Sequence, residues 1–174
     1  MHYLKNLYIK NLKYDLLNKF FYKKIQKLPK IKKIILNFGC KTTNIKVLAN
    51  HLLALELITD KKGFLKKAKR LNLTFKIKKG NPVGCICTLT KKSKLNFVAT
   101  ILTEIFTKIK QLNKLKCNKS CFSYTIKNCL NFNCSKNHYY VFNNLSNLNF
   151  TIITNSLKKQ ETLFILKSLQ LPLK

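Results

Sequence analysis

An alternating pattern over residues 71–90 is the feature that most constrains the fold of this chain. Successive side chains of a β-strand point to opposite faces, so strict alternation predicts strands with one buried and one solvated face. Gly80 and Pro82 interrupt the pattern, which predicts a β-hairpin whose basic tip, residues 76–82, projects beyond the sheet. The apolar positions of the two predicted strands are Leu71, Leu73, Phe75 and Ile77, then Val83, Cys85, Cys87 and Leu89.

Periodic apolar residues elsewhere predict helices and further strands. We expect helices over residues 4–20, 47–58, 98–112 and 157–169, and strands over residues 31–37, 122–126 and 148–152. Asn155 or Ser156 would cap the last helix, and residues 131–137 would form a loop. Hairpin-linked strands with separate helices predict the α+β class: an antiparallel β-sheet with helices packed on one face and a projecting basic β-hairpin.

The length of 174 residues suits a single domain. We expect one domain over residues 1–174, with an N-terminal helix within residues 1–27. A sheet-and-helix body would follow over residues 28–174, with the hairpin tip near residues 76–84. The start of the chain lacks the apolar core of a signal peptide, and no stretch is long and apolar enough for a membrane span.

The balance of charge limits the class of partner. The chain has 35 Lys and Arg residues against 5 Asp and Glu, a formal net charge of +30. Such a surface repels itself and favours polyanions, namely RNA, DNA or anionic lipid. Nucleic acid is the favoured partner, because the charge runs along the whole chain. The dominant residues, Asn, Lys, Ile, Leu and Phe, have AT-rich codons, which is typical of an organellar gene.

Catalytic and metal-binding patterns are weak. The acidic residues are widely scattered, the histidines have no nucleophile beside them, and no glycine-rich phosphate loop occurs, which favours a binding protein over an enzyme. Cys85 and Cys87 lie on the apolar side of a predicted strand, where thiols act as small hydrophobic side chains. We therefore predict no cofactor and no metal. A zinc site remains an alternative at Cys117, Cys121, Cys129, Cys134 and His138.

Four stretches together carry a resemblance to a known family. They are residues 28–39 (LPKIKKIILNFG), residues 67–90 with the blocks KAKR, FKIKKGNPVG and CTLT, residues 122–126 (FSYTI), and residues 148–154 together with the ending LQLPLK. In order and spacing these resemble the L-five family of large-subunit ribosomal proteins, the universal 5S-rRNA-binding proteins of the central protuberance. The resemblance covers nearly the whole chain, and its central block is the most specific part.

The resemblance implies a structural protein of an organellar ribosome that binds rRNA and takes part in translation without catalysis. The implied partners are 5S rRNA or its replacement, large-subunit rRNA, the tRNA in the peptidyl (P) site and neighbouring ribosomal proteins. The mitochondrial matrix is the expected compartment, with the plastid as second candidate. The implied rRNA-binding residues are Asn37, Lys61, Lys67, Lys69, Arg70, Phe75 and Thr88. The implied tRNA-contacting loop consists of Lys76, Lys78, Lys79, Gly80, Asn81 and Pro82.

The chain also departs from the family pattern. Lys78 and Thr90 stand where the family has arginine, Lys61 stands where it has glutamine, and the loop after Gly39 is shorter. These changes bear on the individual RNA contacts and on whether the RNA partner is a normal 5S rRNA. A zinc-dependent or general basic nucleic-acid-binding protein outside the ribosome is the alternative function. A membrane-surface protein and an RNA-processing enzyme are further rivals.

Overall fold

The computed structural model describes residues 2–22, 24–40, 43–108 and 116–171. The chain forms two compact units: unit 1 comprises Met1–Ile34, Thr90–Tyr124 and Thr151–Lys174, and unit 2 comprises Ile35–Leu89 and Thr125–Phe150. The helices are α1 (His2–Leu7), α2 (Lys13–Lys19), α3 (Ile45–Thr59), α4 (Lys91–Thr100), α5 (Asn133–Lys136), α6 (Tyr139–Phe142) and α7 (Lys159–Ser168). Two π-helical segments, η1 (Tyr8–Leu12) and η3 (Ile101–Ile105), and two 3-10 turns, η2 (Ile25–Lys27) and η4 (Cys129–Asn131), complete the helical structure.

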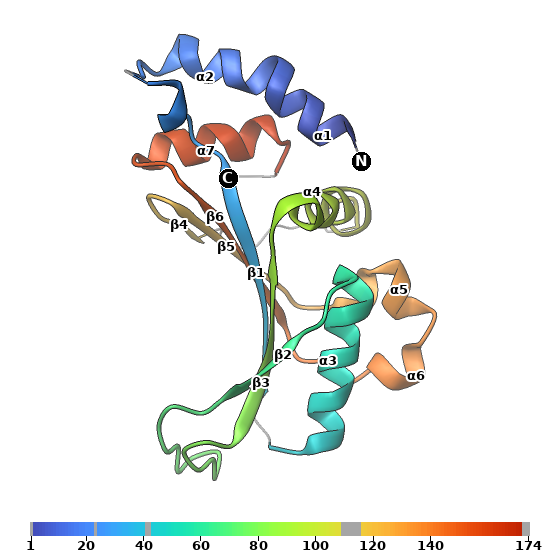
Figure 1. Cartoon of the computed structure of the whole chain (residues 1–174). Helices are drawn as coiled ribbons and strands as arrows, with labels where there is room; N and C mark the ends of the chain where they lie inside the picture. Colours follow the sequence, from blue (N-terminus) through green and yellow to red (C-terminus); the bar gives the residue numbers. More distant parts are fainter. Residues whose placement is uncertain (1, 23, 41–42, 109–115, 172–174) are drawn as a thin grey trace. The chain divides into compact units, whose positions relative to one another are not determined.

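The strands form one sheet with the order β2-β3-β1-β6-β5-β4 (Figure 1). They are β1 (Ile31–Gly39), β2 (Phe64–Lys67), β3 (Pro82–Leu89), β4 (Lys116–Cys117), β5 (Cys121–Ile126) and β6 (Leu148–Thr154). Both β2 with β3 and β4 with β5 pair antiparallel. An antiparallel sheet with helices packed on it confirms the predicted α+β class. The strands predicted over residues 31–37, 122–126 and 148–152 are confirmed as parts of β1, β5 and β6.

The N-terminal helix of unit 1 is amphipathic, as the sequence predicts. It runs through α1, η1 and α2, and its leucines at positions 4, 12 and 16 are buried. It ends after Lys19, because Phe20 takes an extended backbone conformation. The Tyr8 hydroxyl donates a hydrogen bond to the carbonyl oxygen of Pro29 at 2.9 Å and ties this helix to the segment that precedes β1.

Two other helices of unit 1 differ from prediction at their ends. The helix expected over residues 98–112 begins earlier, at Lys91, and its predicted end at residues 109–112 lies outside the described residues. Helix α7 begins at Lys159, and the cap predicted at Asn155 or Ser156 is wrong. The reason is that both side chains have other partners: Asn155 accepts from the Lys30 backbone N–H, and Ser156 bonds Thr154 and Thr162.

In unit 2, α3 covers one face of β3 (Figure 1). The Cys85 thiol donates to the carbonyl oxygen of Leu48 at 3.5 Å, and the Cys87 sulfur lies 3.5 Å from Thr59 Oγ1. Both cysteines are buried, as their alternation predicts. The loop predicted over residues 131–137 is wrong in part, because η4 and α5 occupy most of it; the Asn128 side chain accepts from the Leu130 N–H and starts the first turn.

The predicted hairpin is not confirmed. Residues 71–77 form turns with one bridge between Asn72 and Ile77. The unpredicted strand β2 takes the place of the first hairpin strand beside β3. The alternation does not mark a strand here. Ile77 is buried, but the apolar side chains at positions 71, 73 and 75 are exposed. Lys76 has a left-handed backbone conformation (φ 52°), which turns the chain where a strand would continue.

Every helix within the described part of the chain is too short or too polar to cross a membrane.

Candidate nucleic-acid interface

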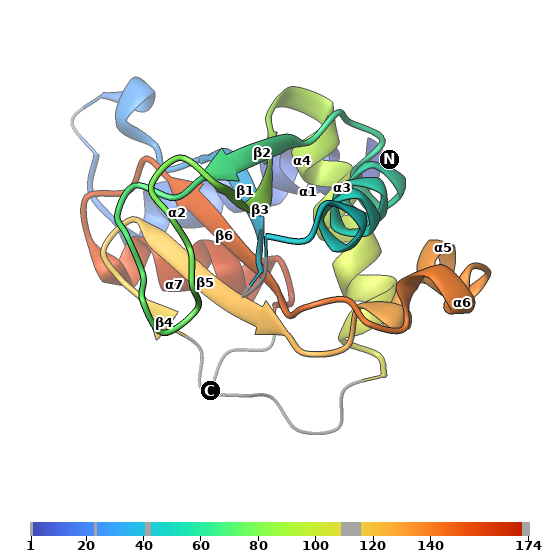
Figure 2. The same ribbon diagram turned by 90° about the horizontal axis from the view of Figure 1, so that it is seen from below.

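A basic arm, defined as residues 67–82, extends from the antiparallel ladder of β2 and β3. The ladder places Leu65 opposite Cys85 and Lys67 opposite Pro82, with an irregularity between Lys66 and Lys67. Figures 1 and 2 show that the arm runs out on the side of β3 away from α3. Apart from the buried Ile77, the side chains of the arm therefore lie largely in solvent.

Two pairs of backbone hydrogen bonds hold the arm in shape. At its base, the Ala68 N–H donates to Asn81 at 2.8 Å, and the Gly80 N–H donates back to Ala68 at 2.9 Å. Further out, Asn72 and Ile77 exchange two bonds of 2.9 Å each. Gly80 has φ +91°, a conformation that glycine adopts without steric cost. These backbone hydrogen bonds within the arm thus hold its shape.

The outermost turn of the arm is closed by the Asn72 side chain. Its Oδ1 accepts from Thr74 Oγ1 at 2.6 Å and from the Phe75 N–H at 3.4 Å. The Lys76 N–H donates to the carbonyl oxygen of Leu73 at 3.1 Å. An asparagine side chain that bonds the backbone two or three residues ahead is a frequent turn-former. The tip therefore has a defined conformation.

Positive charge and exposed apolar surface occur together on the arm. Its basic side chains are all exposed: Lys67, Lys69, Arg70, Lys76, Lys78 and Lys79. No acidic residue lies between Asp60 and Glu104 in the sequence. Leu73 is 82% exposed, Phe75 is 48% exposed, and Phe64 of the adjoining strand β2 is 68% exposed. Lysines beside uncovered aromatic and aliphatic side chains are typical of surfaces that bind RNA phosphates and stack bases.

The open face of the sheet in unit 2 carries two more of the predicted residues. On β3, Cys85, Cys87 and Leu89 are buried on the face that α3 covers, so Thr88 points to the opposite face and is exposed. On β1, Asn37 lies between buried Leu36 and Phe38 and is half-buried. These two side chains can donate and accept hydrogen bonds with phosphate or ribose hydroxyl groups.

The two strands that form this open face, β1 and β3, lie in close contact. The Cys40 N–H donates to the Val83 carbonyl at 2.9 Å. A Cβ atom built on Gly84 would lie only 2.6 Å from the carbonyl oxygen of Phe38. Glycine is thus required at this position of the GNPVG block, because any side chain would force the strands apart.

The cysteines offer little metal chemistry. Among the described residues, no group of three or more His, Cys, Asp or Glu side chains is placed to hold a metal ion. Burial raises the pKa of Cys85 to about 11 and that of Cys129 to about 12. Burial therefore favours the protonated form of both thiols, and a zinc ion would have to displace these protons. Cys117 and Cys121 are half-buried and Cys134 is exposed.

Comparison with known proteins identifies the family. None of the family models searched matches the chain. The large ribosomal subunit protein uL5m of Reclinomonas americana is 34% identical over 179 residues, which cover 99% of this chain and 98% of the relative. The protein uL5c of Oedogonium cardiacum is 30% identical over 98% of this chain and 97% of its own, and uL5 of Geobacter sulfurreducens is 27% identical over 97% of each. This chain belongs to the uL5 family. The resemblance found in the sequence is thereby confirmed.

Within this uL5 chain, the predicted RNA-binding residues fall into separate places. Asn37 and Thr88 lie on the open sheet face, and Lys61 lies just beyond the end of α3, where it is half-buried. The other predicted residues all belong to the basic arm: Lys67, Lys69, Arg70, Phe75, Lys76, Lys78, Lys79, Gly80, Asn81 and Pro82. Phe75 is 48% exposed, so it lies on the surface although its place in the alternating pattern predicts a buried side chain.

Sequence reasoning missed β2 and the exposed apolar residues Phe64 and Leu65. All four residues of β2 are exposed, so this strand shows no alternation of apolar and polar residues. The sequence signal for this strand was the apolar pair Phe64 and Leu65, which follows Gly63 and precedes two lysines. His51 was also missed as a core residue: it is 2% exposed and packs edge-to-face on Phe38 at 5.1 Å between ring centroids.

Proposed function

We propose that this chain is a structural constituent of the large ribosomal subunit and binds rRNA at the central protuberance. The basic arm carries the proposal, because its exposed lysines occur with no acidic residue nearby in sequence. Membership of the uL5 family supports the ribosomal setting. The partner RNA is 5S rRNA, or the RNA that replaces it, together with large-subunit rRNA.

The open sheet face and the arm take different parts in this proposal. Asn37 and Thr88 bind the rRNA backbone and ribose groups, which are recognised by shape. Residues 76–82 of the arm contact the tRNA in the P site. Lysines suit that contact, since each acts as a point charge without the two-pronged hydrogen bonding of arginine. A tRNA must leave after each cycle of translation, so a weak electrostatic contact is appropriate.

The proposed role is binding without catalysis or cofactor, in contact with neighbouring ribosomal proteins. The mitochondrial ribosome is the proposed location. The named mitochondrial relative of Reclinomonas americana and the AT-biased composition support it. The plastid is the second candidate, since plastid relatives have similar identity.

Sedimentation of an organelle lysate tests the proposal. The chain should migrate with the large ribosomal subunit at moderate salt and shift to the top of the gradient after RNase treatment. Association with 5S rRNA is then measured by probing the same fractions for that RNA. Sedimentation as a small free protein before RNase, or with membranes regardless of RNase, would overturn the ribosomal assignment.

A further inference from the structure

In unit 1 the N-terminal helix passes α4 and α7 (Figure 1). Residues of these helices line an apolar groove. It consists of two neighbouring cavities, of about 320 Å³ and about 270 Å³, that share Leu4, Leu95 and Leu169 as walls. Ile9 and Tyr3 stand at its rim, 50% and 71% exposed. Uncovered apolar surface of this kind is typical of a site for another molecule.

Positive charge surrounds the first cavity. Lys5, Lys30 and Lys94 line it, and no acidic side chain lines either cavity among the described residues. Lys94 is half-buried and its Nζ donates to the carbonyl oxygen of Ile31. Burial and, to a smaller extent, the charge of Lys30 lower the pKa of Lys94. A carboxylate placed between these two lysines would offset both effects.

The acidic side chains of unit 1 are Asp15, Glu104 and Glu161, and none of them lines the groove. None of these three acidic side chains therefore supplies an anion to the groove. A second copy would bring a further charge of +30 and be repelled. A hydrated phosphodiester backbone could pair with these lysines but would leave the apolar cavities unfilled. The ligand that matches both the apolar walls and the lysines of the groove is an amphipathic protein segment with an apolar face and an acidic side chain.

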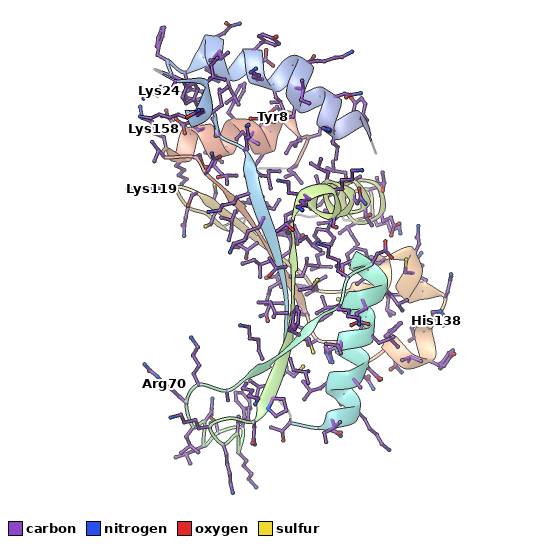
Figure 3. The ribbon with its side chains drawn as sticks, in the orientation of Figure 1. Tyr8, Lys24, Arg70, Lys119, His138 and Lys158 are labelled. Atoms are coloured by element: carbon purple, nitrogen blue, oxygen red, sulfur yellow. The ribbon has the colours of Figure 1, made fainter. Side chains whose placement is uncertain are left out.

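We propose that the groove between the N-terminal helix, α4 and α7 docks an amphipathic, acidic segment of another protein. Its apolar residues fill the two cavities, and its carboxylate pairs with Lys30 and Lys94. Tyr8 holds the helix in place beside the groove through its bond to Pro29 (Figure 3). This site goes beyond the proposed function, since it requires no RNA and involves no residue of the basic arm.

Binding of a defined peptide to the full chain tests the site. The probe is a fluorescent helical peptide with leucines at positions i, i+3, i+4 and i+7 and two glutamates at the edge of that face. One matched peptide has glutamine in place of glutamate, and another has the same composition in scrambled order. The acidic amphipathic peptide should bind tightest, because only this peptide both fills the cavities with leucines and pairs its carboxylates with the lysines.

Variants of the chain locate the binding. Lys30→Glu, whose side chain is exposed, should weaken binding of the acidic peptide roughly tenfold, the effect of about 1.4 kcal/mol. Lys94→Gln provides a second variant, and circular dichroism checks that each variant folds. Lys119→Glu is the matched control: this lysine is exposed in unit 1, lines neither cavity (Figure 3), and should leave binding nearly unchanged.

Several results would overturn the proposal. Equal binding of the scrambled peptide, or an equal loss in Lys119→Glu, would mean general attraction to a basic surface. Displacement of the peptide by a single-stranded uridine oligonucleotide in the wild type, with the same weakening of that RNA in Lys30→Glu, would assign the groove to RNA. Photo-crosslinks from the peptide leucines to Ile9 or Leu95 support docking; crosslinks confined to the basic arm contradict it.

Discussion

Gly84 shows how a single hydrogen atom in place of a side chain sets the distance between β1 and β3. We expect Gly84→Ala to lower the free energy of unfolding by about 1–3 kcal/mol, the range for an overpacked site, because the added Cβ would lie 2.6 Å from a backbone oxygen. Urea unfolding measures the change. Gly39→Ala is the control, since nothing lies within 4 Å of a Cβ there. Equal stability of the two variants would contradict the close approach.

His51 is a second residue whose role follows from its contacts. Its Nδ1 lies 2.6 Å from the Val47 carbonyl oxygen, and its Nε2 accepts from the Ser146 N–H at 2.8 Å. Replacement by alanine should cost about 2–4 kcal/mol of stability, because it creates a cavity in the core and removes the partner of the part-buried Ser146 backbone N–H. Thermal unfolding checks this. His138→Ala, at an exposed position, should change the stability little (Figure 3).

At the scale of the element, the basic arm is ordered by its own hydrogen bonds, so its charge can be removed without touching the core. The triple variant Lys76→Gln, Lys78→Gln, Lys79→Gln should bind RNA more weakly. The slope of log affinity against log salt should become shallower by about 2–3, the value for loss of three phosphate contacts. Fluorescence anisotropy across a salt series measures this slope.

A charge-matched control separates the arm from general electrostatics. The exposed lysines Lys10, Lys24 and Lys136 lie outside the arm, and their replacement by glutamine removes the same charge. This control should retain most of the affinity and the slope. A similar loss in both triple variants would show that the arm has no special part in RNA binding.

At the scale of the whole molecule, a net charge of +30 should destabilise the free protein by self-repulsion. Raising NaCl from about 20 mM to about 500 mM shortens the Debye length to a few ångströms. The unfolding temperature should then rise by about 4–8 °C, the shift that ~2 kcal/mol produces in a chain of this length. Differential scanning fluorimetry measures it, with sucrose as an uncharged stabiliser for comparison. A fall in unfolding temperature with salt would contradict the expectation.

The sequence by itself determined the α+β class and the family, and its net charge of +30 favours a polyanion as partner. Local periodicity placed β1, β5, β6 and the main helices, because each buries one face against a core and so carries a regular apolar pattern. The blocks at residues 28–39 and 67–90 carry much of the family resemblance, and the second includes Gly84, where the backbone leaves no room for a side chain.

Only the tertiary structure decided what residues 64–77 form. The same alternation that marks a strand occurs at Leu71, Leu73 and Phe75, yet these side chains are exposed in the basic arm. The strand that pairs with β3 on the side away from β1 is β2, which lacks alternation because neither of its faces is buried. An alternation of apolar and polar residues indicates a strand only where one face of that strand is buried. Where pairing is made by backbone hydrogen bonds with no burial, the choice of partner depends on the neighbouring strand and not on the local sequence.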